Sequence, residues 1–171
     1  MLNVDPSGLK RDTVRLQNEF ELNDYIIDLA WSPCSKQIAA VTVEGHVFLV
    51  DIDKGTKICE PIGNHKIGCN SVSWNPHASQ FSTAGQDSKV LIWDSSSRAK
   101  FSELDAGGDW VSNVAYNPCR KQLASGASRT TKIWNDDYDL IYESSDHSST
   151  IADIGWNPDG SGLAVAAYNG I

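Results

Sequence analysis

His65 and Asp87 are residue types that could form a catalytic pair, because a carboxylate can orient an imidazole that acts as a general base. Such a pair also needs a nucleophile, or other polar groups that converge on one point. The sequence contains no G-x-x-x-x-G-K-[ST] phosphate loop, no H-E-x-x-H zinc pattern and no G-x-S-x-G nucleophile turn. We therefore predict no catalytic residues and expect that the chain is not an enzyme.

Two further groups of residues could bind metal ions. Cys34, His77 and Cys119 each follow a proline in a turn, but a shared ion would need all donors within about 2–2.3 Å of one atom. We expect these turns to stand too far apart. The acidic run from Asp136 to Asp139 begins like a calcium loop, yet the glycine and terminal glutamate of such a loop do not follow. We therefore expect no metal and no cofactor.

A repeated motif organises the elements that position these residues. The segments DLAWSPCSKQIAAV, SVSWNPHASQFSTA, NVAYNPCRKQLASG and DIGWNPDGSGLAVA occur in that order. Their aromatic residues, Trp31, Trp74, Tyr116 and Trp156, stand 43, 42 and 40 residues apart. A self-similar period of this size indicates a repeat architecture in which neighbouring units share their cores.

The second repeat, from Ser71 to Asp94, shows how one unit is built. A first apolar run ends at Trp74, because Pro76 has no N–H with which to continue a strand ladder. A second run ends at Gly85, where a turn through Asp87 reverses the chain, and a third run ends at Asp94. Valine, isoleucine, leucine and tryptophan at the apolar positions suit half-buried strands.

The same pattern predicts strands along the whole chain. The expected strands are 26–31, 37–42, 47–52 and 56–60 in the first repeat; 70–74, 80–84, 89–93 and 98–104 in the second; 111–116, 121–126, 130–134 and 139–143 in the third; and 151–156 and 162–167 in the fourth. Residues 13–16 and 20–22 are expected to form an outer strand of another unit. Residues 1–12 are expected to be a flexible N-terminus.

This period, with Trp93-Asp94 and its counterparts Val50-Asp51 and Trp134-Asn135, resembles the WD-repeat β-propellers. The resemblance implies an all-β fold of about three and a half four-stranded antiparallel blades that do not close. The expected units are approximately 22–62, 63–104, 105–146 and 147–171. Propellers have about 4–8 blades. The chain is therefore expected to be the N-terminal half of a longer propeller, and the alternative is association of two such halves.

In this family a histidine, a serine or threonine, an aspartate and a tryptophan form a hydrogen-bonded tetrad in each blade. The resemblance assigns these roles in the second repeat to His65, Thr83, Asp87 and Trp93. His147 and Ser125 fit the pattern only in part, and the first repeat lacks it. We expect loss of the His65 imidazole to cost about 1–3 kcal/mol through the partners it leaves unpaired.

The resemblance also implies that the residues just before each inner strand face a rim where protein partners dock. Those positions hold Tyr25, Gly68, Trp110 and Thr150. Exposed aromatic side chains supply contact area with little rotamer entropy to lose. Tyr25 and Trp110 are therefore the expected contact residues, the alternative being that both merely cover the core. The rim residues expected around them are Asp28, Gln86, Asp109, Arg129 and Asp153.

Composition restricts the partners. The 171-residue chain carries a net charge of −8 without a long basic cluster, which disfavours nucleic acid. No apolar run approaches the ~18 residues of a membrane span, and the N-terminus has no secretory apolar core. The four cysteines lack a C-x-x-C spacing and are expected to be free thiols in the core or in turns. A cytoplasmic location is therefore expected.

Together these features predict a non-catalytic scaffold that assembles proteins through its rim. Negative charge would favour partners with basic patches. Self-association through open propeller edges is a further expectation. One alternative is a sensory or regulatory propeller attached to an enzyme encoded elsewhere in a longer protein, and another is a catalytic propeller.

Overall fold

The computed structural model describes residues 18–54 and 59–169. The expectations for residues 1–12 and for a strand at 13–16 lie outside these ranges.

Within the described ranges the chain forms three four-stranded antiparallel sheets and one two-stranded sheet. The first sheet contains β1 (Ile26–Trp31), β2 (Gln37–Thr42), β3 (His46–Asp51) and β4 (Gly63–Asn64), and the second contains β5 (Cys69–Trp74), β6 (Gln80–Gly85), β7 (Lys89–Asp94) and β8 (Lys100–Asp105). The third contains β9 (Val111–Tyr116), β10 (Leu123–Ala127), β11 (Thr130–Trp134) and β12 (Leu140–Ser144), the fourth contains β13 (Ile151–Trp156) and β14 (Leu163–Ala167), and a short 3₁₀ helix, η1, spans Ile52–Lys54.

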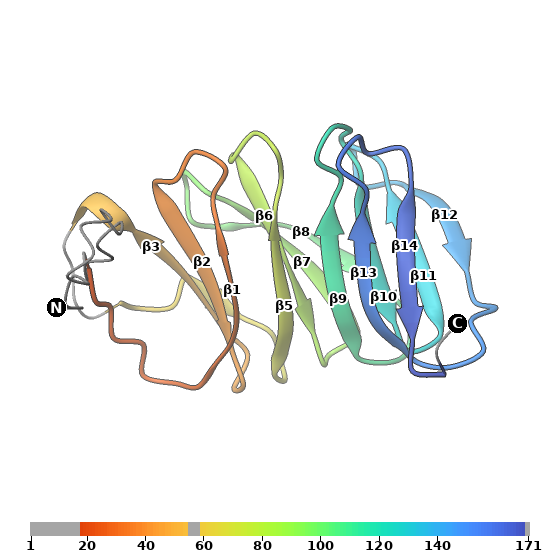
Figure 1. Ribbon diagram of the computed structural model, residues 1–171. Coiled ribbons are helices and arrows are strands. Elements are labelled where there is room, and N and C mark those ends of the chain that lie inside the picture. The colour runs from red at the N-terminus through yellow and green to blue at the C-terminus, as the bar shows by residue number, and fades with distance from the viewer. Residues whose placement is uncertain (1–17, 55–58, 170–171) are drawn as a thin grey trace, which may run out of the picture.

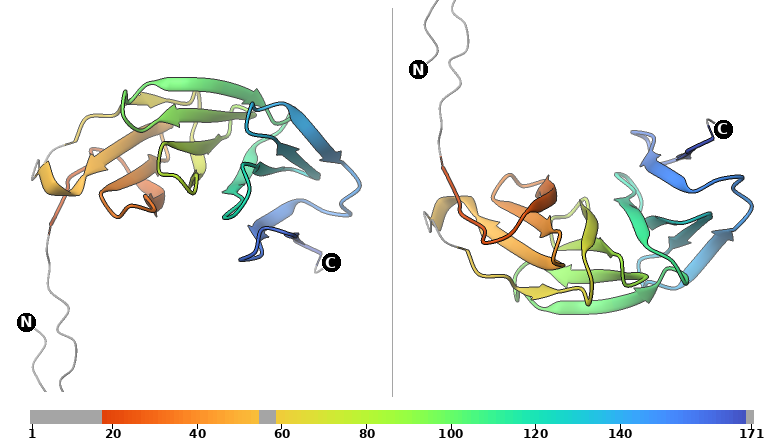
Figure 2. Two further views of the ribbon diagram at one scale, coloured as in Figure 1. Left: turned by 90° about the horizontal axis from the view of Figure 1, so that it is seen from above. Right: turned by 90° about the horizontal axis from the view of Figure 1, so that it is seen from below.

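The sheets follow one another along an open arc (Figures 1 and 2). The first strands of the sheets, β1, β5, β9 and β13, lie on the concave side, and the outer strands β8 and β12 lie on the convex side. Each sheet is a meander in which sequential strands are neighbours. The predicted all-β fold of three complete blades and part of a fourth, not closed, is confirmed.

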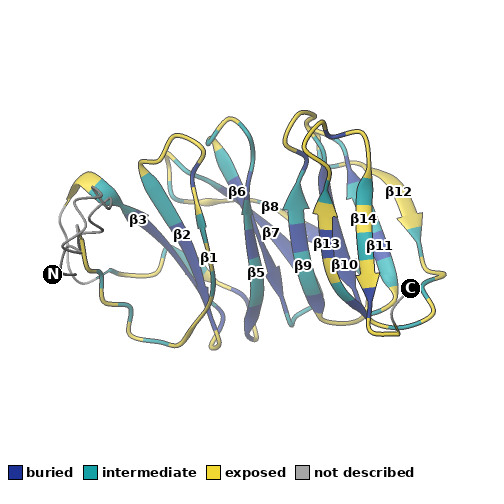
Figure 3. Ribbon diagram, in the orientation of Figure 1, coloured by how far each residue is buried: buried dark blue, intermediate teal, exposed yellow. Residues whose placement is uncertain are grey.

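The core lies between the blades. Ala39 and Val41 of the first sheet pack with Trp74 and Phe81 of the second, whereas Ile92 of the second packs with residues of the third. Figure 3 shows the central strands of the first two sheets, together with β10, as largely buried, whereas the outer strand β12 is exposed along most of its length. Because each blade buries one face against the next, stability rises with the number of stacked neighbours.

Indole side chains also tie the inner strands together. Trp74 Nε1 donates to the carbonyl of Ala30 at 2.9 Å, and Trp156 Nε1 donates to the carbonyl of Ala115 at 3.0 Å. Each of these bonds joins one blade to the preceding one. The recurring aromatic therefore fixes the spacing of neighbouring blades and fills the core at the same time.

Every inner strand carries a β-bulge at the same place. The strand pairing shifts register at Ile27, Asn70, Ser112 and Ala152, each four residues before the recurring aromatic. A bulge leaves one residue outside the ladder and bends the strand. In two blades its side chain bonds to the next blade: Asn70 Nδ2 donates to Val111 O at 2.8 Å, and Ser112 Oγ donates to Ile151 O at 3.3 Å.

The fourth strand of the first blade differs from the prediction in the part that the structure describes. It was expected at 56–60, but the pairing with β3 is made by β4, two residues long, through Gly63 and Asn64. Pro61 has no N–H to donate, so regular pairing resumes only beyond it. Cys59 N–H instead donates to Glu21 O at 3.2 Å, so the segment at 20–22 contributes only an isolated bridge. Residues 55–58 lie outside the described ranges.

Candidate interaction rim

The four inner strands begin at the lower edge of the molecule in Figure 1. We call this edge the lower rim and define it by the residues before each inner strand and the turns that follow each second strand. Backbone hydrogen bonds join the two parts: Val43 N–H donates to Tyr25 O at 2.9 Å, and Gln86 N–H donates to Gly68 O at 2.8 Å. Within each of these two blades the parts of the lower rim are therefore held together by the backbone.

Aromatic side chains stand out from this rim. Tyr25 is 82% exposed and Trp110 is 62% exposed, so both rings present most of their surface to solvent. Tyr168, 77% exposed, follows β14 at the same rim, and the unit pattern places it at the position of Gln86. An open concavity of about 620 Å³ is lined by Asn70, Asp109, Trp110, Ser112, Ser128, Thr150, Ile151, Ala152 and Tyr168.

The polar residues expected on the rim have different surroundings. Asp109 is exposed beside Trp110. Asp28 is half-buried and accepts hydrogen bonds from Leu29 N–H and Val72 N–H, both at 2.9 Å, so that its carboxylate joins β1 to β5. Such a carboxylate serves the stacking of the blades.

Three more of these residues are engaged with protein groups. Gln86 Nε2 donates to Asn70 Oδ1 at 3.3 Å, and Arg129 Nε donates to the carbonyl of His147 at 2.6 Å. Asp153 is exposed and accepts from Asn113 Nδ2 at 3.2 Å. The rim therefore combines exposed aromatic rings with polar side chains that are held in place.

A buried chain of hydrogen bonds supports the rim in the second blade. Trp93 Nε1 donates to Thr83 Oγ1 at 3.0 Å, and this hydroxyl lies 2.8 Å from His65 Nε2. His65 Nδ1 lies 2.9 Å from Asp87, whose other oxygen accepts Lys66 N–H at 2.9 Å. The structure thus brings together the four residues that the resemblance assigned to a tetrad.

The electrostatics of this chain follow from burial. Burial lowers the pKa of His65 below its ordinary value of 6.5 and outweighs the opposing effect of the Asp87 carboxylate. Burial alone would raise the pKa of Asp87, but the hydrogen bonds from Lys66 N–H and His65 hold it below 3.8. A neutral imidazole then donates from Nδ1 to the carboxylate and accepts at Nε2, so every group has a partner.

The other blades depart from this arrangement. Ser125 of the third blade is fully buried, and its Oγ has no hydrogen-bond partner. Gly107, in the place of the histidine, supplies no side chain. His147 reaches the preceding blade, where its Nε2 lies 2.9 Å from Thr131 Oγ1 on β11. Since Val165 has no hydroxyl, its own second strand offers no such partner.

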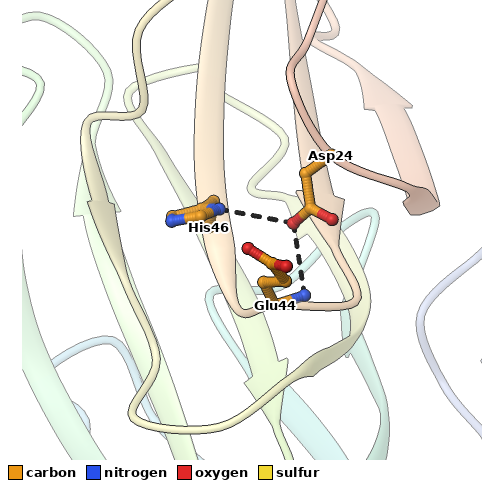
Figure 4. A group of neighbouring side chains, drawn as sticks. All are labelled: Asp24, Glu44 and His46. Atoms are coloured by element: carbon orange, nitrogen blue, oxygen red, sulfur yellow. Dashed lines mark hydrogen bonds and ion pairs between the residues drawn. The ribbon is translucent and has the colours of Figure 1, made fainter.

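The first blade contains an aspartate–histidine pair that was not predicted from the sequence, and its two members come from positions exchanged relative to the second blade. Asp24, in the loop before β1, lies 3.3 Å through Oδ2 from His46 Nδ1 at the start of β3, and it accepts Glu44 N–H at 3.2 Å (Figure 4). In the second blade the loop supplies the histidine and the turn supplies the aspartate. Burial would raise the pKa of Asp24, but hydrogen bonds from Thr42 and the backbone hold it below 3.8. Only a search for exchanged positions could have found this pair in the sequence.

Cys34, His77 and Cys119 are exposed in their turns, and among the described residues they form no cluster of metal ligands. Cys119 Sγ instead contacts Pro158 O at 3.3 Å. Within the same ranges, the one group whose donor atoms converge is Asp24, Glu44 and His46. No helix in the described part of the chain is long and apolar enough to cross a bilayer.

Comparison with known proteins agrees with this architecture. The family described as "WD domain, G-beta repeat" matches residues 56–94 and 100–135. The crystal structure of RRP9 WD40 repeats superposes with a TM-score of 0.71 at 18% identity, covering 78% of this chain and 42% of that one. The structure of U3-55K also has a TM-score of 0.71, at 18% identity over 78% of this chain and 43% of that one. Fold and repeats together define a partial β-propeller.

The matched segments, 56–94 and 100–135, are WD repeats, and together with the fold they support a WD-repeat β-propeller without pointing to a specific member. The chain is 29% identical over 161 residues to the Intraflagellar transport protein 122 homolog of Xenopus tropicalis, covering 92% of this chain and 13% of that protein. It is 25% identical over 178 residues to Protein transport protein sec13 of Aspergillus fumigatus, covering 86% of this chain and 58% of that protein. The chain therefore spans less than two thirds of the length of these relatives.

Proposed function

We propose that this chain is a non-catalytic scaffold that binds protein partners at its lower rim, with Tyr25 and Trp110 as the contact residues. The observation that carries the proposal is the 62% exposed ring of Trp110 on the edge of an open concavity, with Tyr25 exposed on the same rim. Exposed aromatic residues beside a concave surface are typical of binding hot spots. The relatives, one named for intraflagellar transport and one for protein transport, support a role in protein assembly.

The partner segment is expected to be basic. Asp109 lies next to Trp110 and is exposed, and the chain carries a net charge of −8. A lysine or arginine of the partner would meet the carboxylate and the face of the indole together. Gln86, Arg129 and Asp153 complete the proposed contact surface, whereas Asp28 contributes by holding β1 against β5.

Replacement of both aromatics tests the proposal. Tyr25→Ala combined with Trp110→Ala is expected to abolish recovery of the partners that the unmodified protein captures from cells, without changing its circular dichroism or its unfolding midpoint. Phe101→Ala is the matched control, because Phe101 is 61% exposed but lies on the outer strand β8. Equal recovery by the double variant and the control would refute the role of the rim.

We also infer that the open face of β1 supports self-association. Ile27, Leu29 and Trp31 alternate along β1 and are all exposed, so they present an apolar stripe at the first blade. Leu29→Glu is expected to shift the protein toward the monomer in sedimentation velocity. A concentration-independent monomer before the substitution would exclude association.

The location that we propose is cytoplasmic. Cys34 and Cys119 are free thiols in exposed turns, and exposed unpaired thiols suit a reducing compartment. Thiol labelling of the protein in intact and in permeabilised cells would test this, since a disulfide-bonded or extracellular form would contradict it.

A further inference from the structure

Asp24, Glu44 and His46 place two carboxylates and an imidazole together on the lower rim (Figure 4). One ligand atom from each residue lies within 4.8 Å of the other two. Carboxylate oxygen and imidazole nitrogen are the donors that zinc takes besides thiolate. The three residues come from two separate segments, the loop before β1 and the turn between β2 and β3, and the fold brings these segments together.

The turn that carries Glu44 and His46 is held rigidly. Gly45 has a φ of +95°, and a Cβ there would lie 2.0 Å from Ile67 O, so the position admits only glycine. Thr42 Oγ1 accepts His46 N–H at 3.0 Å and closes the turn. Asp24 Oδ2 already lies 3.3 Å from His46 Nδ1. These two donors are thus held close together before any ion binds.

The Asp24–His46 pair differs from the Asp87–His65 pair in being open. The side chain of His65 is 0% exposed and both of its ring nitrogens have partners. His46 is 38% exposed, and its Nε2 makes no hydrogen bond with any residue that the structure describes, whereas the Asp24 carboxylate beside it is only 3% exposed. A buried carboxylate thus faces an imidazole that solvent can reach.

We propose that Asp24, Glu44 and His46 bind a zinc ion or a similar divalent metal ion. Two donors on one ion can stand at most about 4.2 Å apart. Asp24 and His46 already meet this limit, and the exposed Glu44 side chain closes the remaining gap by rotating about its own bonds. Asp24 Oδ2 keeps its hydrogen bond from Glu44 N–H, because a carboxylate oxygen has a second lone pair for the ion.

Bound metal would join the loop before β1 to the turn after β2 through side chains as well as through the backbone. Tyr25 directly follows Asp24, so the ion would brace the part of the rim that carries this aromatic ring. With three protein donors, the ion would take water as a further ligand. The proposed role is to brace this part of the rim, because the ion would join two segments that already meet through Asp24 and His46.

Calorimetric titration of metal-free protein with zinc chloride tests the site. The background is Cys34→Ser with Cys119→Ser, because both thiols are exposed and could bind zinc on their own. One equivalent of zinc is expected to bind and to raise the unfolding temperature. His46→Ala and Glu44→Gln are each expected to weaken binding by about tenfold or more and to remove this rise.

His77→Ala is the matched control, because it removes another exposed histidine from a turn outside the cluster. Its zinc affinity should equal that of the background protein. The proposal is overturned if the background protein releases no heat of binding, or if His46→Ala binds zinc as tightly as His77→Ala. Circular dichroism of each variant establishes that a loss of binding is not a loss of fold.

Discussion

The indole Nε1 of Trp93 donates a hydrogen bond to Oγ1 of Thr83 at 3.0 Å across the pairing of β7 with β6. In the third blade the equivalent residues are Trp134 and Ser125, both buried. Ser125 Oγ nevertheless has no partner. Two blades that share a pattern of residue types therefore differ in whether the central hydroxyl is satisfied.

Replacing each of the two hydroxyl residues, Thr83 and Ser125, with alanine is therefore expected to change the free energy of unfolding differently. Thr83→Ala is expected to lower the free energy of unfolding by about 1–3 kcal/mol, because His65 and Trp93 lose their shared partner. Ser125→Ala removes a buried hydroxyl that has no partner, and it is expected to leave stability unchanged or to raise it by up to about 1 kcal/mol. Urea unfolding of the two variants measures both; equal losses would show that Ser125 is hydrogen-bonded.

Gly85 is required by the packing of His65. A Cβ at Gly85 would lie 2.0 Å from His65 Nδ1 and 2.4 Å from Asp87 Oδ1. Gly85→Ala is therefore expected to destabilise the protein by about 1–3 kcal/mol through overpacking. Gly155→Ala is the control, because nothing lies within 4 Å of the added carbon, and it should change stability by less than about 1 kcal/mol. Similar losses in the two variants would contradict the close contact.

Stability should fall as the pH drops below neutrality. Burial lowers the pKa of His65 in the folded protein below its ordinary 6.5, so the unfolded chain binds more protons in the window just below that value. The contribution of the neutral imidazole is complete above this window and is lost as the pH falls through it. Asp87, whose folded-state pKa lies below 3.8, adds a second loss in stronger acid.

The measurement is the urea midpoint between about pH 7.5 and about pH 5. His65→Gln removes the titrating group and is expected to flatten the profile over this range. A profile of equal slope in the variant would assign the pH dependence to other residues.

Hydrogen exchange should be slowest in the second blade. Val90, Leu91, Ile92 and Trp93 are buried, and β7 is paired on both sides, by β6 and β8. Among the strands in residues 18–54 and 59–169, only β13 pairs with Leu163–Ala167 of β14. Amide exchange followed by NMR is therefore expected to be slower at Val90–Trp93 than at β14. Faster exchange at Val90–Trp93 would mean that the blades do not unfold from the ends.

Much of the fold could be predicted because each unit repeats the same local signals. Pro76 and Gly85 end strands for reasons that lie in their own covalent structure, so the strand limits of the second blade were within a residue or two of those observed. The fourth strand of the first blade could not be placed in this way. Its position depends on Pro61 and on the bond between Cys59 and Glu21, which no periodic pattern contains.

The candidate site was less accessible to sequence reasoning. Tyr25 and Trp110 could be named because they occupy equivalent positions in the repeat. Tyr168 was not predicted, although it occupies the position of Gln86, because the aromatic residues of the rim were expected only just before each inner strand. The Asp24–His46 pair was missed because its two members have exchanged places relative to Asp87 and His65, and a template with fixed roles cannot recognise an exchange.

The bulge in each inner strand frees one residue from the usual dependence of a side chain on its cross-strand neighbour. A residue inside a ladder cannot change without affecting its cross-strand neighbour, whereas Ile27, Asn70, Ser112 and Ala152 have no such neighbour. Three of them line the concavity beside Trp110. A new side chain at Ala152 would therefore change the chemistry of this surface while the strand register stays the same, whereas changes at Asn70 or Ser112 would also remove a bond to the next blade.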